Sequence, residues 1–366
     1  MLSIPHCRVR QSRLLAHLQR ENFDAAVITL PQHVYYFTGH LPRWTHYAAL
    51  ILQSDGRTWL SCANQGVADA AADRIVAYEA AWMGTQRSDQ VFALAEQVKQ
   101  ELGSARTQRV AVDASAISAQ LAMTFGDKCV SLDSILWQMR RAKDADELAV
   151  MRKANACAEA MYKQARQIVE PGIAELEVFG QLHAAAVHAA GEAMSAPLGN
   201  DFACACGGGP ARNGWRAKAG EIYILDLGPA VAGYFSDTCR AIAVDRKPTD
   251  KQIVAWQTLM EIFPLIEPLA RPGARCRDLF AAADDHLRQA GYPGLGHHLG
   301  HGVGLQAHEF PHLNPRWDDT LIEGEVFTLE PGIYLPELAG GIRLENQYLV
   351  QSGGALNLTP FAMELM

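Results

Sequence analysis

The pattern of apolar and polar positions differs between the N-terminal third of the chain and the remainder. Residues 8–22 carry Leu14, Leu15 and Leu18 on one face at helical spacing, which predicts an amphipathic helix. Short apolar runs of strand length follow, with turn residues beside them (AAVITL, AALILQ, TWLSC and VAVDAS). Because such strands alternate with helical stretches, residues 1 to about 135 are predicted to form an α/β domain.

The remainder of the chain begins with a long run of apolar residues at helical spacing. Asp144 and Glu147 fit a capping box, and ELAVMRKANACAEAMYKQARQIV carries apolar residues at helical spacing. The charged segment QMRRAKDAD precedes this helix and places a domain boundary near residues 136–143. The sequence therefore predicts one domain over residues 1–138 and a second over residues 139–366.

A weak internal repeat runs through the second domain. The pairs Pro171-Gly172 and Pro272-Gly273 lie 101 residues apart, and helical runs of nearly equal length follow them. Pro-Gly commonly precedes helices, but a domain of two similar halves with a site at their seam would leave the same trace.

Length, charge and cysteine content restrict the class of protein. A chain of 366 residues exceeds one ordinary core, which agrees with two domains. The net charge of −8 argues against a nucleic-acid partner, because such a partner needs clustered positive charge. Neither a signal peptide nor an apolar run of about 18 residues is visible, so no membrane association is expected. The eight cysteines are scattered, and the pair Cys204 and Cys206 lacks the second pair of a zinc site, so we expect reduced thiols in the cytoplasm.

Two acidic residues lie near the ends of neighbouring predicted strands. The run EIYILDLG carries Asp226, a turn rich in glycine follows, and YFSDTCRAIAV carries Asp237. A hairpin symmetric about Val231 and Ala232 would place the two carboxylates directly opposite each other. Buried carboxylates in that arrangement repel and need a cation or a shared proton. The alternative is that one of them points to solvent.

The segment 296–312 holds five of the 13 histidines, separated by glycines that permit close backbone approach. Core histidines usually occur singly, so this cluster indicates a site. Not all five can be ligands, and we expect His298 and His312 to be structural or surface residues.

Two apolar strands, 326–334 and 340–350, each carry a glutamate that should be buried, Glu330 and Glu345. A buried glutamate is costly unless it is paired or bound to a metal. An ion pair with Arg343 is the alternative for Glu345. Four carboxylates and one imidazole together suit two divalent ions, about 3.5–4 Å apart, that activate a water.

These motifs resemble the pita-bread metallohydrolases, the family of methionine aminopeptidase, aminopeptidase P, prolidase and creatinase. The resemblance covers nearly the whole chain and includes the turn from Tyr35 to Gly39 and the motifs ILDLG…GYFSDTCR, GHGVGLQAHEFP, LEPGIY and GIRLEN. It implies an α+β fold, in which an N-terminal creatinase-type α/β domain precedes a pita-bread domain with a pseudo-twofold repeat.

The resemblance also implies roles for individual residues. The metal ligands would be Asp226, Asp237, His301, Glu330 and Glu345, holding two ions, with manganese expected first and cobalt, iron or zinc as alternatives. Glu330 would also be the general base. The remaining implied residues are His308 at the substrate carbonyl, His297 in the substrate pocket, and Arg343 holding Glu345 or a substrate carboxylate.

One position departs from the family pattern. Members usually carry a histidine 17 residues before the first ligand aspartate, and here that position is Gly209. That histidine helps to hold substrate and to protonate the leaving nitrogen in prolidases. One possibility is that a small gap in the loop brings Arg212 or Asn213 into the role instead; the alternative is that the loop has diverged and the other histidines suffice.

The resemblance implies an Xaa-Pro dipeptidase or aminopeptidase that acts on short peptides as a homodimer, with residues near Trp44 reaching the partner's site. The unusual loop around Gly209 motivates a second hypothesis, a hydrolase or lyase of a small non-peptide substrate. A third is a metal-free binding module on the same fold, against which the complete ligand set argues.

Overall fold

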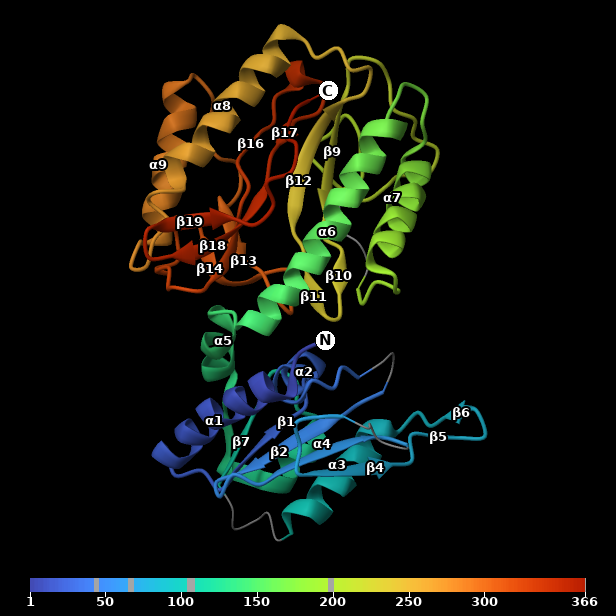
Figure 1. Ribbon diagram of the computed structural model, residues 1–366, viewed down its shortest axis with the longest axis vertical. Helices are drawn as coiled ribbons and strands as arrows, with labels where there is room; N and C mark the ends of the chain where they lie inside the picture. The colour runs from blue at the N-terminus through green and yellow to red at the C-terminus, as the bar shows by residue number, and fades with distance from the viewer. Residues whose placement is uncertain (43–45, 65–68, 104–108, 197–200, 366) are drawn as a thin grey trace. The chain divides into compact units, whose positions relative to one another are not determined.

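The computed structural model describes residues 1–42, 46–64, 69–103, 109–196 and 201–365. They form two compact units, Met1–Met139 and Arg140–Met366 (Figure 1). The predicted partner-contacting residues near Trp44 lie outside the described ranges. Among the described helices, none combines the length and apolar character that a membrane crossing requires.

The N-terminal unit is built on a six-stranded sheet with the order β4-β3-β2-β1-β7-β8. At its centre, β1 is antiparallel to β2 and parallel to β7. All four residues of β1 are buried, and a strand buried on both faces requires apolar residues at every position, here AAVI. The strands of this unit, including the small hairpin β5–β6, are β1 (Ala25–Ile28), β2 (Ala49–Gln53), β3 (Thr58–Ala63), β4 (Arg74–Tyr78), β5 (Ala81–Trp82), β6 (Thr85–Gln86), β7 (Val110–Val112) and β8 (Cys129–Ser131).

The helices of this unit differ from the sequence expectation in two places. The predicted helix 8–22 begins earlier, because the Ser3 hydroxyl caps it by accepting from the His6 N–H. The segment before Gly39 is a short helix rather than only a turn, and it ends on Gly39 with φ of 74°. This helix is buried from His33 to Thr38, so it has no amphipathic pattern to detect. The helices are α1 (Ile4–Arg20), α2 (Pro31–Thr38), α3 (Gln90–Leu102), α4 (Ala119–Phe125) and α5 (Asp133–Arg141), whose last two residues belong to the next unit.

Two helix pairs repeat in the C-terminal unit, and a Pro-Gly turn joins the helices of each pair. Asp144 and Glu147 form the predicted capping box at the start of the first helix, and Thr249 and Gln252 form a second one. Figure 1 shows the two pairs on opposite sides of the strands of this unit. The helices are α6 (Ala145–Ile168), α7 (Glu175–Ala190), α8 (Asp250–Ile266) and α9 (Cys276–Gln289).

The strands between the helix pairs form several small sheets. A hairpin pairs β9 with β12, a five-stranded sheet has the order β14-β13-β15-β18-β19, and β10–β11 and β16–β17 are two-stranded. The strands are β9 (Ile222–Leu227), β10 (Ala230–Val231), β11 (Tyr234–Phe235), β12 (Thr238–Ala243), β13 (Gly300–Gly302), β14 (Glu309–Leu313), β15 (Val326–Leu329), β16 (Gly332–Ile333), β17 (Ile342–Arg343), β18 (Asn346–Gln351) and β19 (Gly354–Asn357).

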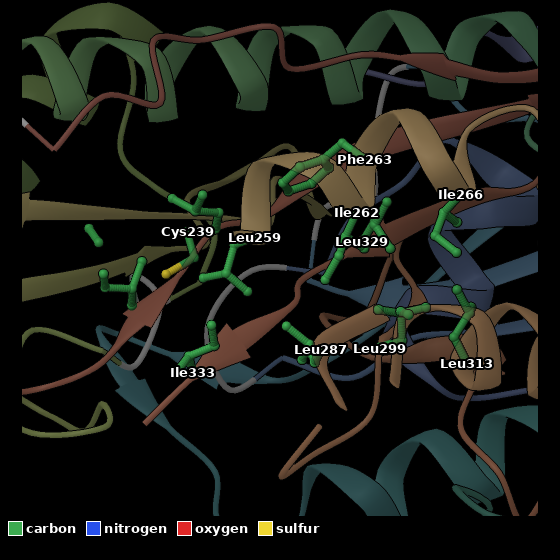
Figure 2. Close-up of a cluster of buried hydrophobic side chains, with 14 of the residues drawn as sticks. Cys239, Leu259, Ile262, Phe263, Ile266, Leu287, Leu299, Leu313, Leu329 and Ile333 are labelled. Atoms are coloured by element: carbon green, nitrogen blue, oxygen red, sulfur yellow. The ribbon is translucent and has the colours of Figure 1, made fainter. Parts of the chain in front are cut away.

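A buried apolar cluster fixes the strands against the second helix pair. Figure 2 shows Leu259, Ile262 and Ile266 of α8 and Leu287 of α9 together with strand residues such as Leu329. Each is inaccessible or nearly so, and full burial of such a side chain stabilises the fold by roughly 1.5–3 kcal/mol. The strands that carry the candidate ligands therefore rest on a rigid support.

Candidate metal centre

Asp226 lies within β9 and Asp237 lies immediately before β12, but their register differs from the prediction. The turn is centred on Ala232 and Gly233, which have φ of 43° and 82°, so Asp226 pairs with Cys239. The directly opposed arrangement is therefore wrong. The offset is two residues, and side chains alternate with a period of two, so both carboxylates still lie on one face of the hairpin.

Glu330 and Glu345 lie where strands break, and the expected continuous strands are wrong at these points. Glu330 separates β15 from β16, and Glu345 separates β17 from β18, because the pieces belong to different sheets. At each break the backbone N–H of the glutamate donates a hydrogen bond to a neighbouring segment. The Glu330 N–H donates to the Leu299 carbonyl and the Glu345 N–H donates to the Cys239 carbonyl, both at 2.9 Å. Glu345 thereby connects the hairpin of the first half to the strands of the second.

His301 is the central residue of β13 and is 4% exposed. Its neighbour Gly302 passes so close to β14 that a Cβ there would lie 1.9 Å from the Phe310 carbonyl oxygen, so glycine is required. Nδ1 of His301 lies 3.0 Å from the Gly302 carbonyl, which directs Nε2 toward the carboxylates. Nε2 lies 3.3 Å from Glu330 Oε1 and 3.7 Å from Asp237 Oδ2.

The five predicted ligands meet in space. Potential ligand atoms of Asp226, Asp237 and Glu345 lie within 4.8 Å of one another, and so do those of His301, Glu330 and Glu345. The two groups share Glu345, so the five side chains would provide ligands for two neighbouring divalent ions. All five side chains line one pocket of about 680 Å³.

Burial and mutual repulsion disturb the titration of these groups. Burial raises the pKa of Asp226 to about 6, although Arg343 opposes the shift. Burial and the charge of Asp226 raise the pKa of Asp237 well above its usual range, and burial and Asp237 do the same to Glu345. Burial alone would lower the pKa of His301, but its hydrogen bond to Glu330 and the charge of Asp237 raise it to about 9. Burial is therefore the main cause of the raised carboxylate pKa values, and neighbouring carboxylates are the cause of the raised pKa of His301.

The chemistry of this donor set fits divalent cations. Glu345 is 1% exposed and its Oε2 is buried without a hydrogen-bond partner, which is costly for a carboxylate oxygen. A ligand set of carboxylate oxygens and one imidazole, without thiolates, is suited to manganese, iron, cobalt or zinc. A second acidic group, at Asp144, Asp146 and Glu147, has a structural explanation, because it forms the capping box of α6.

The histidines divide between the pocket and the surface. His308 stacks on His301 with ring centroids 3.7 Å apart, and His297 Nε2 lies 2.9 Å from the Tyr334 hydroxyl. His298 was expected to be structural or superficial, but it lines the pocket with Nδ1 3.4 Å from Glu330 Oε1. Nothing in the sequence around His298 distinguished it from His312, whose Nδ1 lies 2.9 Å from Asp319 Oδ2.

Arg343 lines the pocket but does not hold Glu345. Its guanidinium donates to Asp226 and to Asp201, an aspartate that sequence reasoning missed. Asp201 stands alone at the start of the glycine-rich loop and belongs to no motif, so no pattern pointed to it. The expected Arg343–Glu345 contact is wrong because Asp226 and Asp201 flank the guanidinium.

The loop that lacks the family histidine brings no substitute into the pocket. Arg212 bonds Glu175 and the Cys204 carbonyl, and it stacks over the Trp215 ring, so these contacts do not favour the possibility that it replaces the family histidine. Among the described residues that line the pocket, neither Arg212 nor Asn213 is present. Gly209 instead donates its N–H to Asp201 at 2.6 Å.

Comparison with known proteins identifies the family. The profile of metallopeptidase family M24 matches residues 149–352, and that of the creatinase/prolidase N-terminal domain matches residues 10–142. The chain therefore belongs to metallopeptidase family M24. This confirms the predicted resemblance and the predicted fold class of a creatinase-type domain followed by a pita-bread domain.

Individual relatives cover nearly the whole chain. An uncharacterized peptidase of Staphylococcus aureus is 28% identical over 355 residues, which are 96% of this chain and 98% of that protein. Prolidase of Pyrococcus furiosus has a TM-score of 0.78 at 24% identity, covering 95% of this chain and 99% of its own. X-Pro aminopeptidase of Thermotoga maritima has a TM-score of 0.80 at 23% identity, covering 97% and 99%.

Proposed function

We propose that this protein is a dinuclear metal-dependent peptidase that hydrolyses the bond between an N-terminal residue and proline. One observation carries the proposal: two groups of three ligand atoms, sharing Glu345, lie in the wall of a pocket large enough for a short peptide. The likeness to a prolidase and an X-Pro aminopeptidase supports the choice of substrate.

The residues of the pocket are assigned to metal binding and to proton transfer. Asp226, Asp237, His301, Glu330 and Glu345 would hold two divalent ions, which supply Lewis acidity and an acidified water. Glu330 is the proposed general base. Burial would raise the pKa of Glu330, but the hydrogen bond and charge of His301 lower it to about 2, so the carboxylate is ionised and available to bind a cation.

The histidines of the pocket are proposed to act on the substrate carbonyl. Partial burial and the charge of His301 lower the pKa of His308 to about 4, so its imidazole is neutral near pH 7. A neutral imidazole can donate one N–H to an oxyanion that develops on the scissile carbonyl. His297 is proposed to line the substrate site, where its Nε2 is fixed by Tyr334.

Membership of a peptidase family favours a peptide over the small non-peptide substrate considered above. The unusual loop, which motivated that alternative, has a structural explanation in its contact with Asp201. The homodimer expected from the resemblance stays a prediction.

The test is a substrate screen of the purified protein with Mn²⁺ or Co²⁺. The panel contains Xaa-Pro dipeptides, their amides, longer Xaa-Pro peptides and small amidines, and a chelated sample is the control. We expect cleavage of at least one class of Xaa-Pro peptide, lost with chelator and restored by metal. Turnover of amidines without cleavage of any Xaa-Pro peptide would overturn the proposal.

A further inference from the structure

Resting on the proposed function, we infer that Asp201 reserves Arg343 for an internal ion pair. The pocket then recognises no free carboxylate on the proline residue. It accepts Xaa-Pro peptides whose proline carboxyl group is amidated or continues into further residues, in preference to dipeptides that end on proline.

The hydrogen bonds of Arg343 carry the inference. Nη2 donates to Asp201 Oδ2 and, at 2.8 Å, to Asp226 Oδ2. Nη1 donates to the Tyr334 hydroxyl at 3.0 Å and to the Gly207 carbonyl at 3.4 Å. A guanidinium has two N–H groups on each terminal nitrogen, so all four have acceptors within the protein. The remaining donor, Nε, is buried and has no hydrogen-bond partner among the described residues.

The loop around Gly208 is shaped to hold Asp201 in this place. Asp201 Oδ1 accepts the Gly209 N–H at 2.6 Å, and its backbone carbonyl accepts the Asp226 N–H at 3.1 Å. Gly208 has φ of 125°, and a Cβ there would lie 2.4 Å from Asp201 Oδ2. A side chain at Gly208 would therefore push the carboxylate away from Arg343. The glycines that replace the usual loop sequence thus have a specific role.

Charge balance explains why a substrate carboxylate would be rejected. Among the described residues lining the pocket, Arg343 is the one lysine or arginine, and Asp201 and Asp226 already flank it. The charge of Asp226 is shared with the metal site, which leaves Asp201 to neutralise Arg343. A third carboxylate would have to displace Asp201, which the fold holds at a high effective concentration. An amide or a continuing peptide carries no charge and meets no such competition.

The experiment compares alanyl-proline with alanyl-prolinamide in the Mn²⁺-loaded protein and in Asp201→Asn. The asparagine keeps an oxygen for the Gly209 N–H, removes the negative charge, and replaces the acceptor that faces Arg343 by an amide N–H donor. For wild type we expect kcat/KM for the free acid at or below that for the amide. In Asp201→Asn we expect the acid-to-amide ratio to rise by roughly tenfold, because Arg343 gains a free charge. Asp278→Asn, which removes an exposed partner of Arg275, is the matched control and should leave the ratio unchanged.

A binding readout keeps this inference separate from the proposed reaction. Calorimetry with L-proline and L-prolinamide measures carboxylate recognition without turnover, even if neither peptide is cleaved. We expect proline to bind wild type no better than prolinamide and to gain roughly tenfold in affinity in Asp201→Asn. A wild-type preference of tenfold or more for the carboxylate form, in cleavage or in binding, overturns the inference. So does an acid-to-amide ratio that is the same in Asp201→Asn as in wild type.

Discussion

Asp237→Asn is expected to abolish peptide cleavage, a loss on the order of a thousandfold or more, while the purified protein keeps its fold. Asp237 contributes a ligand atom to the group it forms with Asp226 and Glu345, and it lies 3.7 Å from His301. Asparagine has the same shape but lacks the charge that a divalent ion needs. Glu330→Ala should have the same effect, because it removes both a ligand and the proposed base.

Thermal unfolding separates loss of metal from loss of fold in this variant. Saturating wild type with Mn²⁺ at about 100 times the dissociation constant should stabilise it by about 2.7 kcal/mol for each ion bound, and Asp237→Asn should lose most of this gain. Without metal, the variant should melt at or above the wild-type temperature, because one of the buried carboxylates that crowd Asp226 and Glu345 is replaced by a neutral amide. Asp319→Asn, which removes the partner of His312, is the matched control. Near-normal turnover in Asp237→Asn would refute the assignment of this residue.

Arg240→Met is expected to destabilise the C-terminal unit by several kcal/mol, of which each orphaned carbonyl accounts for roughly 1–3. Arg240 is 1% exposed, and its hydrogen bonds among the described residues go to backbone carbonyls and an amide oxygen rather than to a carboxylate. Nε donates to the Ala362 carbonyl at 3.0 Å, and Nη1 donates to the Cys239 carbonyl at 2.8 Å and to the Glu345 carbonyl. The same side chain thus joins the C-terminal segment to the backbone of a candidate ligand.

Urea unfolding at fixed metal concentration measures this effect. Arg240→Lys should lose nearly as much stability, because an ammonium cannot reproduce the planar fork. Arg275→Met is the matched control: Arg275 is exposed and pairs with Asp278, so its loss should cost much less stability than the loss of Arg240. A destabilisation of Arg240→Met no larger than that of the control would show that the buried network contributes little.

The sequence predicted the convergence of the ligands better than it predicted their local structure. Carboxylates on apolar strands imply burial, and burial implies a cation, whatever the exact register. For that reason the errors at the hairpin and at the two strand breaks did not separate Asp226, Asp237, Glu330 and Glu345. Register depends on which turn forms, and here the Ala232-Gly233 turn shifted it by two residues.

Contacts between residues far apart in the chain could not be predicted from the sequence. Asp201 and Arg343 are 142 residues apart, and although Arg343 lies in the motif GIRLEN, Asp201 belongs to no motif that would pair the two. His298 resembled its neighbours in the histidine segment, and its place beside Glu330 depends on how the chain enters β13. The helix Pro31–Thr38 was missed because a helix buried on all sides has no polar face.

Elemental analysis of the Mn²⁺-loaded and dialysed protein tests the central assignment most directly. Retention of about two metal ions per chain by wild type, with a clear loss in Asp237→Asn and in Glu345→Gln, is the predicted result. A wild-type protein that keeps no metal after dialysis and gains no thermal stability from added Mn²⁺ would contradict it.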